Sequence, residues 1–103
     1  MTRLEELKIL LVENPTDNFI TYACALELIK LNQVKEAILL LEQLLLRDQD
    51  YLAAYYQLGK FYEMNHEMKN ASQTFTKGME VAKKQNNQRT LNELSSALGL
   101  LDE

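Results

Sequence analysis

The stretch of residues 54–62 restricts the fold of this chain more than any other part of the sequence. Four of its residues fall at positions i, i+3, i+4 and i+7, which is one face of a helix: Tyr55, Leu58, Gly59 and Tyr62. Further along, Ala71, Phe75 and Gly78 form a second helical face of small and large residues. Small side chains on one helix give room to bulky side chains on its neighbour, so the two faces predict a closely packed helix pair.

The composition favours helices over strands. Hydrophobic residues make up 47% and charged residues 25% of the 103 residues, as in a globular domain. The chain has one proline and three glycines, too few for many tight strand turns. Runs rich in Leu, Ala, Glu and Lys have high helix propensity. We therefore predict a single all-α domain.

Parts of the sequence recur at a fixed spacing. Three pairs of identical residues are separated by the same interval: Tyr22 with Tyr56, Lys35 with Lys69, and Ala37 with Ala71. The order Tyr, Leu-Gly, Tyr, then Ala, Phe and a small residue resembles the tetratricopeptide repeat, a helical hairpin whose length of about 34 residues equals this interval. Tyr55 stands where that motif usually has Trp. The whole chain resembles small stand-alone bacterial proteins of this family.

The resemblance implies a fold and a division of the chain. The fold is an all-α, antiparallel helix-hairpin solenoid of the tetratricopeptide type, with about six helices. The predicted parts are a half-repeat helix at 1–14, repeat one at 18–51, repeat two at 52–85 and a C-terminal capping helix at 86–103. The half repeat is a second helix without its first, since Leu7, Leu10 and Leu11 lie one repeat length before Leu41, Leu44 and Leu45.

Local signals predict where the helices begin and end. We expect helices at about 1–13, 18–31, 34–47, 51–65, 68–84 and 88–101, with Leu4, Leu7, Leu10 and Leu11 of the first helix facing inward. Asp17 or Asn18 is expected to cap the second helix and Asp50 the fourth, because their side chains accept hydrogen bonds from free N–H groups. Asn32 is expected to end the second helix in a left-handed conformation.

The resemblance also implies a partner-binding groove, lined by the first helix of each hairpin. Its residues are Phe19, Tyr22, Leu26 and Ile29 in repeat one, and Ala53, Tyr56, Lys60 and Glu63 in repeat two. The first set is fully apolar, and an exposed apolar patch is uncommon on a soluble monomer. Three different groups could cover this apolar surface: a peptide or partner helix, a second copy of the chain, or the chain's own C-terminal leucines.

No pattern for catalysis or for a cofactor is found. Cys24, the only cysteine, falls at a core position, where a free thiol behaves as a small hydrophobe. Glu63, His66 and Glu67 could form a weak metal site, but the end of a helix falls between them and enforces no ligand spacing. We expect no catalytic, cofactor or metal site.

Charge and hydropathy narrow the partners. With a net charge of −4, the chain is not expected to have the basic surface that nucleic-acid binding requires. The longest apolar run is broken by Glu42 and Gln43 and is too short to cross a membrane. The N-terminal segment carries acidic residues, unlike a signal peptide, so a cytoplasmic location is expected.

The sequence therefore predicts a non-catalytic module or scaffold that binds a peptide or partner protein through its concave groove. The alternative is a homodimeric structural protein that uses the apolar stripe from Phe19 to Ile29 as its own interface.

Overall fold

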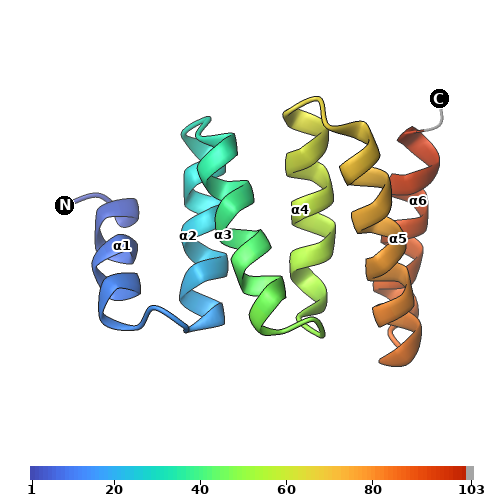
Figure 1. The fold of residues 1–103 in the computed structure, drawn as a ribbon, viewed down its shortest axis with the longest axis horizontal. Helices are drawn as coiled ribbons and strands as arrows, with labels where there is room; N and C mark the ends of the chain where they lie inside the picture. The colour runs from blue at the N-terminus through green and yellow to red at the C-terminus, as the bar shows by residue number, and fades with distance from the viewer. Residues whose placement is uncertain (102–103) are drawn as a thin grey trace. The chain divides into compact units, whose positions relative to one another are not determined.

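The computed structural model describes residues 1–101, which form six α-helices and contain no strand (Figure 1). The helices are α1 (Arg3–Glu13), α2 (Asn18–Lys30), α3 (Val34–Arg47), α4 (Leu52–Met64), α5 (Met68–Lys84) and α6 (Gln88–Leu101). Within this range, no helix combines the length and the apolar character that crossing a membrane requires. The all-α prediction is confirmed, and each helix begins and ends close to its predicted bounds.

The chain divides into two compact units. The first, Met1–Gln49, contains α1, α2 and α3, and the second begins at Asp50 and contains α4, α5 and α6. In the first unit α2 packs against both α1 and α3, and in the second α5 packs against both α4 and α6 (Figure 1). Consecutive helices within each unit run antiparallel because the turns between them are short.

The core of the first unit lies between α2 and α3. Ala25, Leu28, Ala37, Leu41 and Leu44 are completely buried there. By contrast, α1 buries only Leu7. The prediction that Leu10 faces inward is wrong, because 42% of this residue is exposed.

The core of the second unit depends on two glycines. Gly59 of α4 faces the ring of Phe75, which is completely buried, so that a Cβ added at Gly59 would overlap the ring. At Gly78 of α5, an added Cβ would lie 2.7 Å from the Tyr55 Cβ and 3.0 Å from the Leu94 Cδ1. The predicted packing of small residues against large ones is confirmed, and α6 joins it through Leu94.

The residues that cap the N-termini of the helices were predicted only in part. Asp17 caps α2, since its Oδ1 accepts a hydrogen bond of 2.9 Å from the Ile20 N–H. Thr2 caps α1 in the same way through the Glu5 N–H, which the sequence did not lead us to expect. The N-cap residue of α4 is Tyr51 rather than the predicted Asp50, and the Tyr51 side chain makes no capping hydrogen bond.

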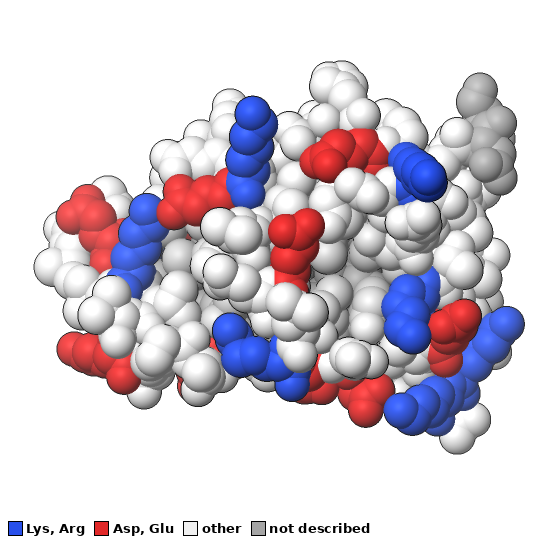
Figure 2. Space-filling model, in the orientation of Figure 1, with Lys and Arg blue, Asp and Glu red and all other residues white. Residues whose placement is uncertain are grey.

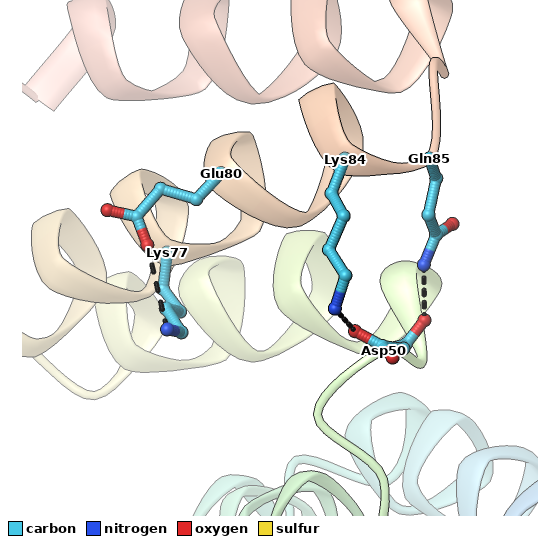
Figure 3. Close-up of polar contacts among 5 residues, drawn as sticks. All are labelled: Asp50, Lys77, Glu80, Lys84 and Gln85. Carbon is cyan, nitrogen blue, oxygen red and sulfur yellow. Dashed lines mark hydrogen bonds and ion pairs between the residues drawn. The ribbon is translucent and has the colours of Figure 1, made fainter.

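Asp50 instead ties the start of α4 to the end of α5. Its Oδ1 lies 3.3 Å from the Lys84 Nζ, and its backbone carbonyl accepts a 2.7 Å hydrogen bond from the Gln85 Nε2 (Figure 3). The carboxylate thus pairs with a cation at the far end of the hairpin. An exposed ion pair of this kind contributes about 0–1 kcal/mol.

Three helices end in the same left-handed turn. Asn32, His66 and Asn86 have φ angles of 60°, 60° and 57°. In each turn the next residue donates its N–H to a carbonyl in the last turn of the helix, as Gln33 does to Leu28 at 3.0 Å. This Schellman arrangement satisfies carbonyls that a helix end would otherwise leave free. The prediction for Asn32 is confirmed, and His66 occupies the equivalent position one repeat later.

Candidate partner-binding surfaces

An apolar hollow lies beside α2 in the first unit. It has a volume of about 290 Å³ and is lined by Phe19, Tyr22, Ala23, Leu26, Glu27 and Lys30 of α2 and by Arg3 of α1. The hollow brings together three of the predicted groove residues: Phe19, Tyr22 and Leu26. Ile29 is half-buried on the same helix and does not line it. Phe19 is 71% exposed, so its ring lies outside the hydrophobic core.

Charged groups surround this hollow at the end of α2. The Lys30 Nζ lies 3.0 Å from the Glu27 Oε2, and the exposed Arg3 lies at the start of α1. Antiparallel packing of α1 on α2 places Arg3 at the same end as Lys30. The hollow therefore combines an apolar floor with a charged rim, an arrangement typical of protein-binding surfaces.

The four predicted groove residues of α4 lie in the second unit and are more engaged with their surroundings. Ala53 is exposed, whereas Tyr56 is half-buried with its ring 6.3 Å from the Phe75 ring and tilted by 45°. The Lys60 Nζ lies 3.2 Å from the Glu63 Oε2, an oxygen that is buried and accepts no hydrogen bond within the described chain. Tyr56 thus contributes to the core as well as to the surface.

A second hollow in the first unit was not foreseen from the sequence. It measures about 450 Å³, and its lining includes Leu11 and Val12 of α1, Cys24 of α2 and Leu40 of α3. The Lys8 Nζ and the Glu36 Oε1, 3.2 Å apart, form an ion pair between α1 and α3 on its wall. No sequence motif indicates this hollow, because its walls are assembled from three different helices.

Cys24 is buried against this hollow with 1% of its surface exposed. Burial raises the pKa of its thiol above the ordinary value; the Lys8 charge lowers the pKa and the Glu36 charge raises it, both less strongly. The neutral thiol is therefore preferred in the folded chain. The stability that this preference contributes is present at pH values below the pKa of the unfolded thiol and is lost as the pH rises through the folded pKa.

We expect iodoacetamide to modify Cys24 much more slowly in the folded chain than in urea, because the reagent attacks the thiolate and needs access to it. The rate in the folded chain should begin to rise at a higher pH than the rate in urea. Mass spectrometry of timed samples between neutral and alkaline pH measures both rates. Equal pH profiles would contradict the burial of the thiol.

The residues considered for a metal site are separated by a turn. α4 ends at Met64, and His66 follows it in a left-handed conformation. Across the described chain, His, Cys, Asp and Glu side chains do not gather in groups of three or more that could hold a metal ion.

Acidic and basic side chains are interspersed on the face drawn in Figure 2. Several ion pairs join neighbouring residues of one helix, such as Lys77 with Glu80 at 3.6 Å and Arg89 with Glu93 at 3.4 Å. Such an interspersed surface favours partners that bind through apolar contacts with charges of both signs around them. It does not favour partners that carry a large net charge of one sign.

Solved structures resemble this chain closely. A solution NMR structure of a tetratricopeptide repeat domain protein from Salinibacter ruber is 38% identical, covers 84% of this chain and 88% of its own, and superposes with a TM-score of 0.80. A crystal structure of a tetratricopeptide repeat domain protein from the same organism is 37% identical, covers 84% and 97% of the two chains, and has a TM-score of 0.79.

A more distant structure shares the fold alone. A protein from Bordetella parapertussis is 22% identical, covers 99% of this chain and 89% of its own, and has a TM-score of 0.86. No protein-family model and no curated protein matches the sequence.

Proposed function

Because this chain belongs to the tetratricopeptide repeat family, we propose that it is a non-catalytic interaction module that binds a peptide or partner protein. Repeat proteins of this kind bind partners along the surface formed by corresponding helices. The contact residues we propose are Phe19, Tyr22, Leu26 and Ile29 on α2, with Ala53, Tyr56, Lys60 and Glu63 on α4 as a second set.

The exposed ring of Phe19 at the edge of the α2 hollow is the observation that supports this most. An aromatic side chain that is 71% exposed beside an apolar hollow costs free energy unless a partner covers it. Tyr22 and Leu26 continue the same surface into the hollow. Aromatic anchors in such positions supply most of the affinity at protein interfaces. Glu27, Lys30 and Arg3 would then orient the ligand.

The test is a peptide ligand selected from a random phage-displayed library with the native chain as bait. We expect Phe19→Ser and Tyr22→Ala each to weaken its binding by tenfold or more, a loss of about 1.4 kcal/mol or more. Leu46→Ser is the matched control, because Leu46 of α3 is 83% exposed and lies outside the hollow. If the control variant loses as much affinity as the two others in calorimetry, the α2 surface is not the binding site.

The alternative, a homodimer through the stripe from Phe19 to Ile29, also draws on the exposed Phe19 ring. Two copies that cover each other through this stripe would form an isologous interface. Light scattering distinguishes the two functions. If the chain is a homodimer through this stripe, Phe19→Ser should turn the dimer into a monomer without any added peptide.

A further inference from the structure

The second hollow of the first unit, formed by α1, α2 and α3, has no part in the proposed peptide site. We propose that it binds an uncharged small molecule that is mainly hydrocarbon and carries one hydroxyl group. The hollow that holds Phe19 and Tyr22 shares no lining residue with it. Binding of the small molecule can therefore be tested separately from binding of the peptide.

Two helices form the walls of this hollow. Both α1 and α3 line it together with α2, which supplies the floor. Leu11 and Val12 line the hollow from α1, and Val12 is 82% exposed. On α3, Glu36, Leu40 and Gln43 fall at i, i+4 and i+7, so they lie along one face of the helix. The α3 wall is thus aliphatic in its middle and polar at both ends.

The hollow is deep enough and large enough for a small ligand. Its floor includes Cys24, which is only 1% exposed, so the hollow extends down to the buried layer of the unit. Its volume of about 450 Å³ falls within the range of about 300–1,000 Å³ that is typical of small-molecule sites. Water fills such a space at about 30 Å³ per molecule. A hydrocarbon ligand would release this water from the aliphatic walls, which favours binding.

The charges of the lining cancel. The Lys8 Nζ lies 3.2 Å from the Glu36 Oε1, and the other side chains that line the hollow are uncharged types. Burial raises the pKa of the Cys24 thiol, so the floor is neutral as well. A ligand with a carboxylate would meet Glu36, and a ligand with an ammonium group would meet Lys8. Because like charges repel, an uncharged ligand is favoured over either ion.

The same ion pair can bind a hydroxyl group. An ammonium group has three N–H donors and a carboxylate has two acceptor oxygens, so a single contact leaves both with free capacity. The side chains of Lys8 and Glu36 are 48% and 44% exposed, which keeps them accessible to a ligand. A hydroxyl group can accept from Lys8 and donate to Glu36 without separating the pair. The hydrocarbon part then lies against Leu11, Val12 and Leu40.

Three probes with the same eight-carbon chain test this preference: 1-octanol, octanoate and octylammonium. Each is titrated into the native chain, and two-dimensional NMR follows the backbone amide signals. We expect octanol to shift the signals of the lining residues and to bind about tenfold or more tightly than either ion, because only octanol leaves the Lys8–Glu36 pair intact. Octanol should also slow the modification of Cys24 by iodoacetamide, since the ligand lies over the thiol.

Val12→Glu places a charge on the wall, at a position exposed enough to leave the fold intact. We expect it to weaken octanol binding about tenfold or more. Leu46→Glu is the matched control, because Leu46 is 83% exposed and lies outside the hollow. It should bind octanol as the native chain does. Circular dichroism verifies that both variants are folded.

Two further variants test the ion pair itself. Glu36→Gln leaves Lys8 without its carboxylate partner, so octanoate should become the preferred probe. Lys8→Gln leaves Glu36 without its ammonium partner, so octylammonium should become the preferred probe. Both positions are exposed, so we expect both variants to fold. A purely greasy surface would show no such exchange of preference.

Several results would overturn the proposal. They are octanol that shifts no signal of the lining residues, octanoate or octylammonium bound as tightly as octanol by the native chain, a Val12→Glu variant with native affinity, and charge variants with an unchanged preference. If octanol fails while the phage-selected peptide shifts these signals, a protein segment occupies the hollow. If octanol fails while the signals shift with protein concentration alone, a second copy of the chain occupies it.

Discussion

Replacing Phe75 with alanine should lower the free energy of unfolding by about 3–5 kcal/mol, the usual cost of removing a buried phenylalanine ring. Phe75 is the largest side chain that is completely buried in the described chain. Its ring fills the space over Gly59 and packs against the Tyr56 ring. Since the total stability of a small domain is about 5–15 kcal/mol, this one change should remove a large part of it.

The matched control for this variant is Phe19→Ala, which removes the same ring from a position that is 71% exposed. Exposed substitutions usually change stability by less than about 0.5 kcal/mol. Urea denaturation followed by circular dichroism gives both values. If the two variants unfold at the same urea concentration, Phe75 does not have the role in the core that its burial indicates.

The sequence predicted the helices well because several independent signals agree at each break. Asn14 before Pro15, Asn32 and the pair Asn86-Asn87 stop helices for local reasons, and all of them fall between apolar faces that recur once per repeat. The buried faces of α4 and α5 could also be predicted, because a glycine on one helix and a phenylalanine on the next indicate close packing of the two helices.

The errors arise where a distant residue decides the outcome. Asp50 has the chemistry of a helix cap, but its carboxylate pairs with Lys84 at the far end of α5, and Tyr51 rather than Asp50 stands at the N-cap of α4. Leu10 has the spacing of a core residue, but periodicity does not reveal whether a second helix covers that side. His66 adopts the same left-handed conformation as Asn32 one repeat earlier, because the turn geometry recurs with the repeat.

The candidate site was predictable only as a set of residues on a face. The spacing of Phe19, Tyr22 and Leu26 placed them together on α2, and the hollow that they line depends on Arg3 of another helix. The spacing of the α4 residues gave no sign that Tyr56 packs on a phenylalanine ring or that the lysine and glutamate after it form an ion pair. Such contacts depend on side-chain conformations that a helical period does not specify.

The same substitution, glycine to alanine, should have opposite effects at Gly59 and at Gly99. Alanine is favoured over glycine inside a helix by about 1 kcal/mol, so both variants gain this term. At Gly59 the added methyl group overlaps the Phe75 ring, which is completely buried and cannot move aside. Overpacking of this kind costs about 1–3 kcal/mol or more, which outweighs the helix preference. We therefore expect Gly59→Ala to destabilise the fold.

At Gly99 the added methyl group meets open space, so Gly99→Ala should raise the free energy of unfolding by about 0.5–1 kcal/mol. Denaturant unfolding of both variants at low protein concentration measures the contrast. A double variant, Gly59→Ala with Phe75→Leu, isolates the cause, because the smaller leucine makes room for the methyl group and should recover part of the loss. Two results would contradict this account: Gly59→Ala as stabilising as Gly99→Ala, or no recovery from Phe75→Leu. Either result would mean that contact with the Phe75 ring does not require a glycine at position 59. The packing of small residues against large ones, inferred for both hairpins, would then fail where it is most clearly seen.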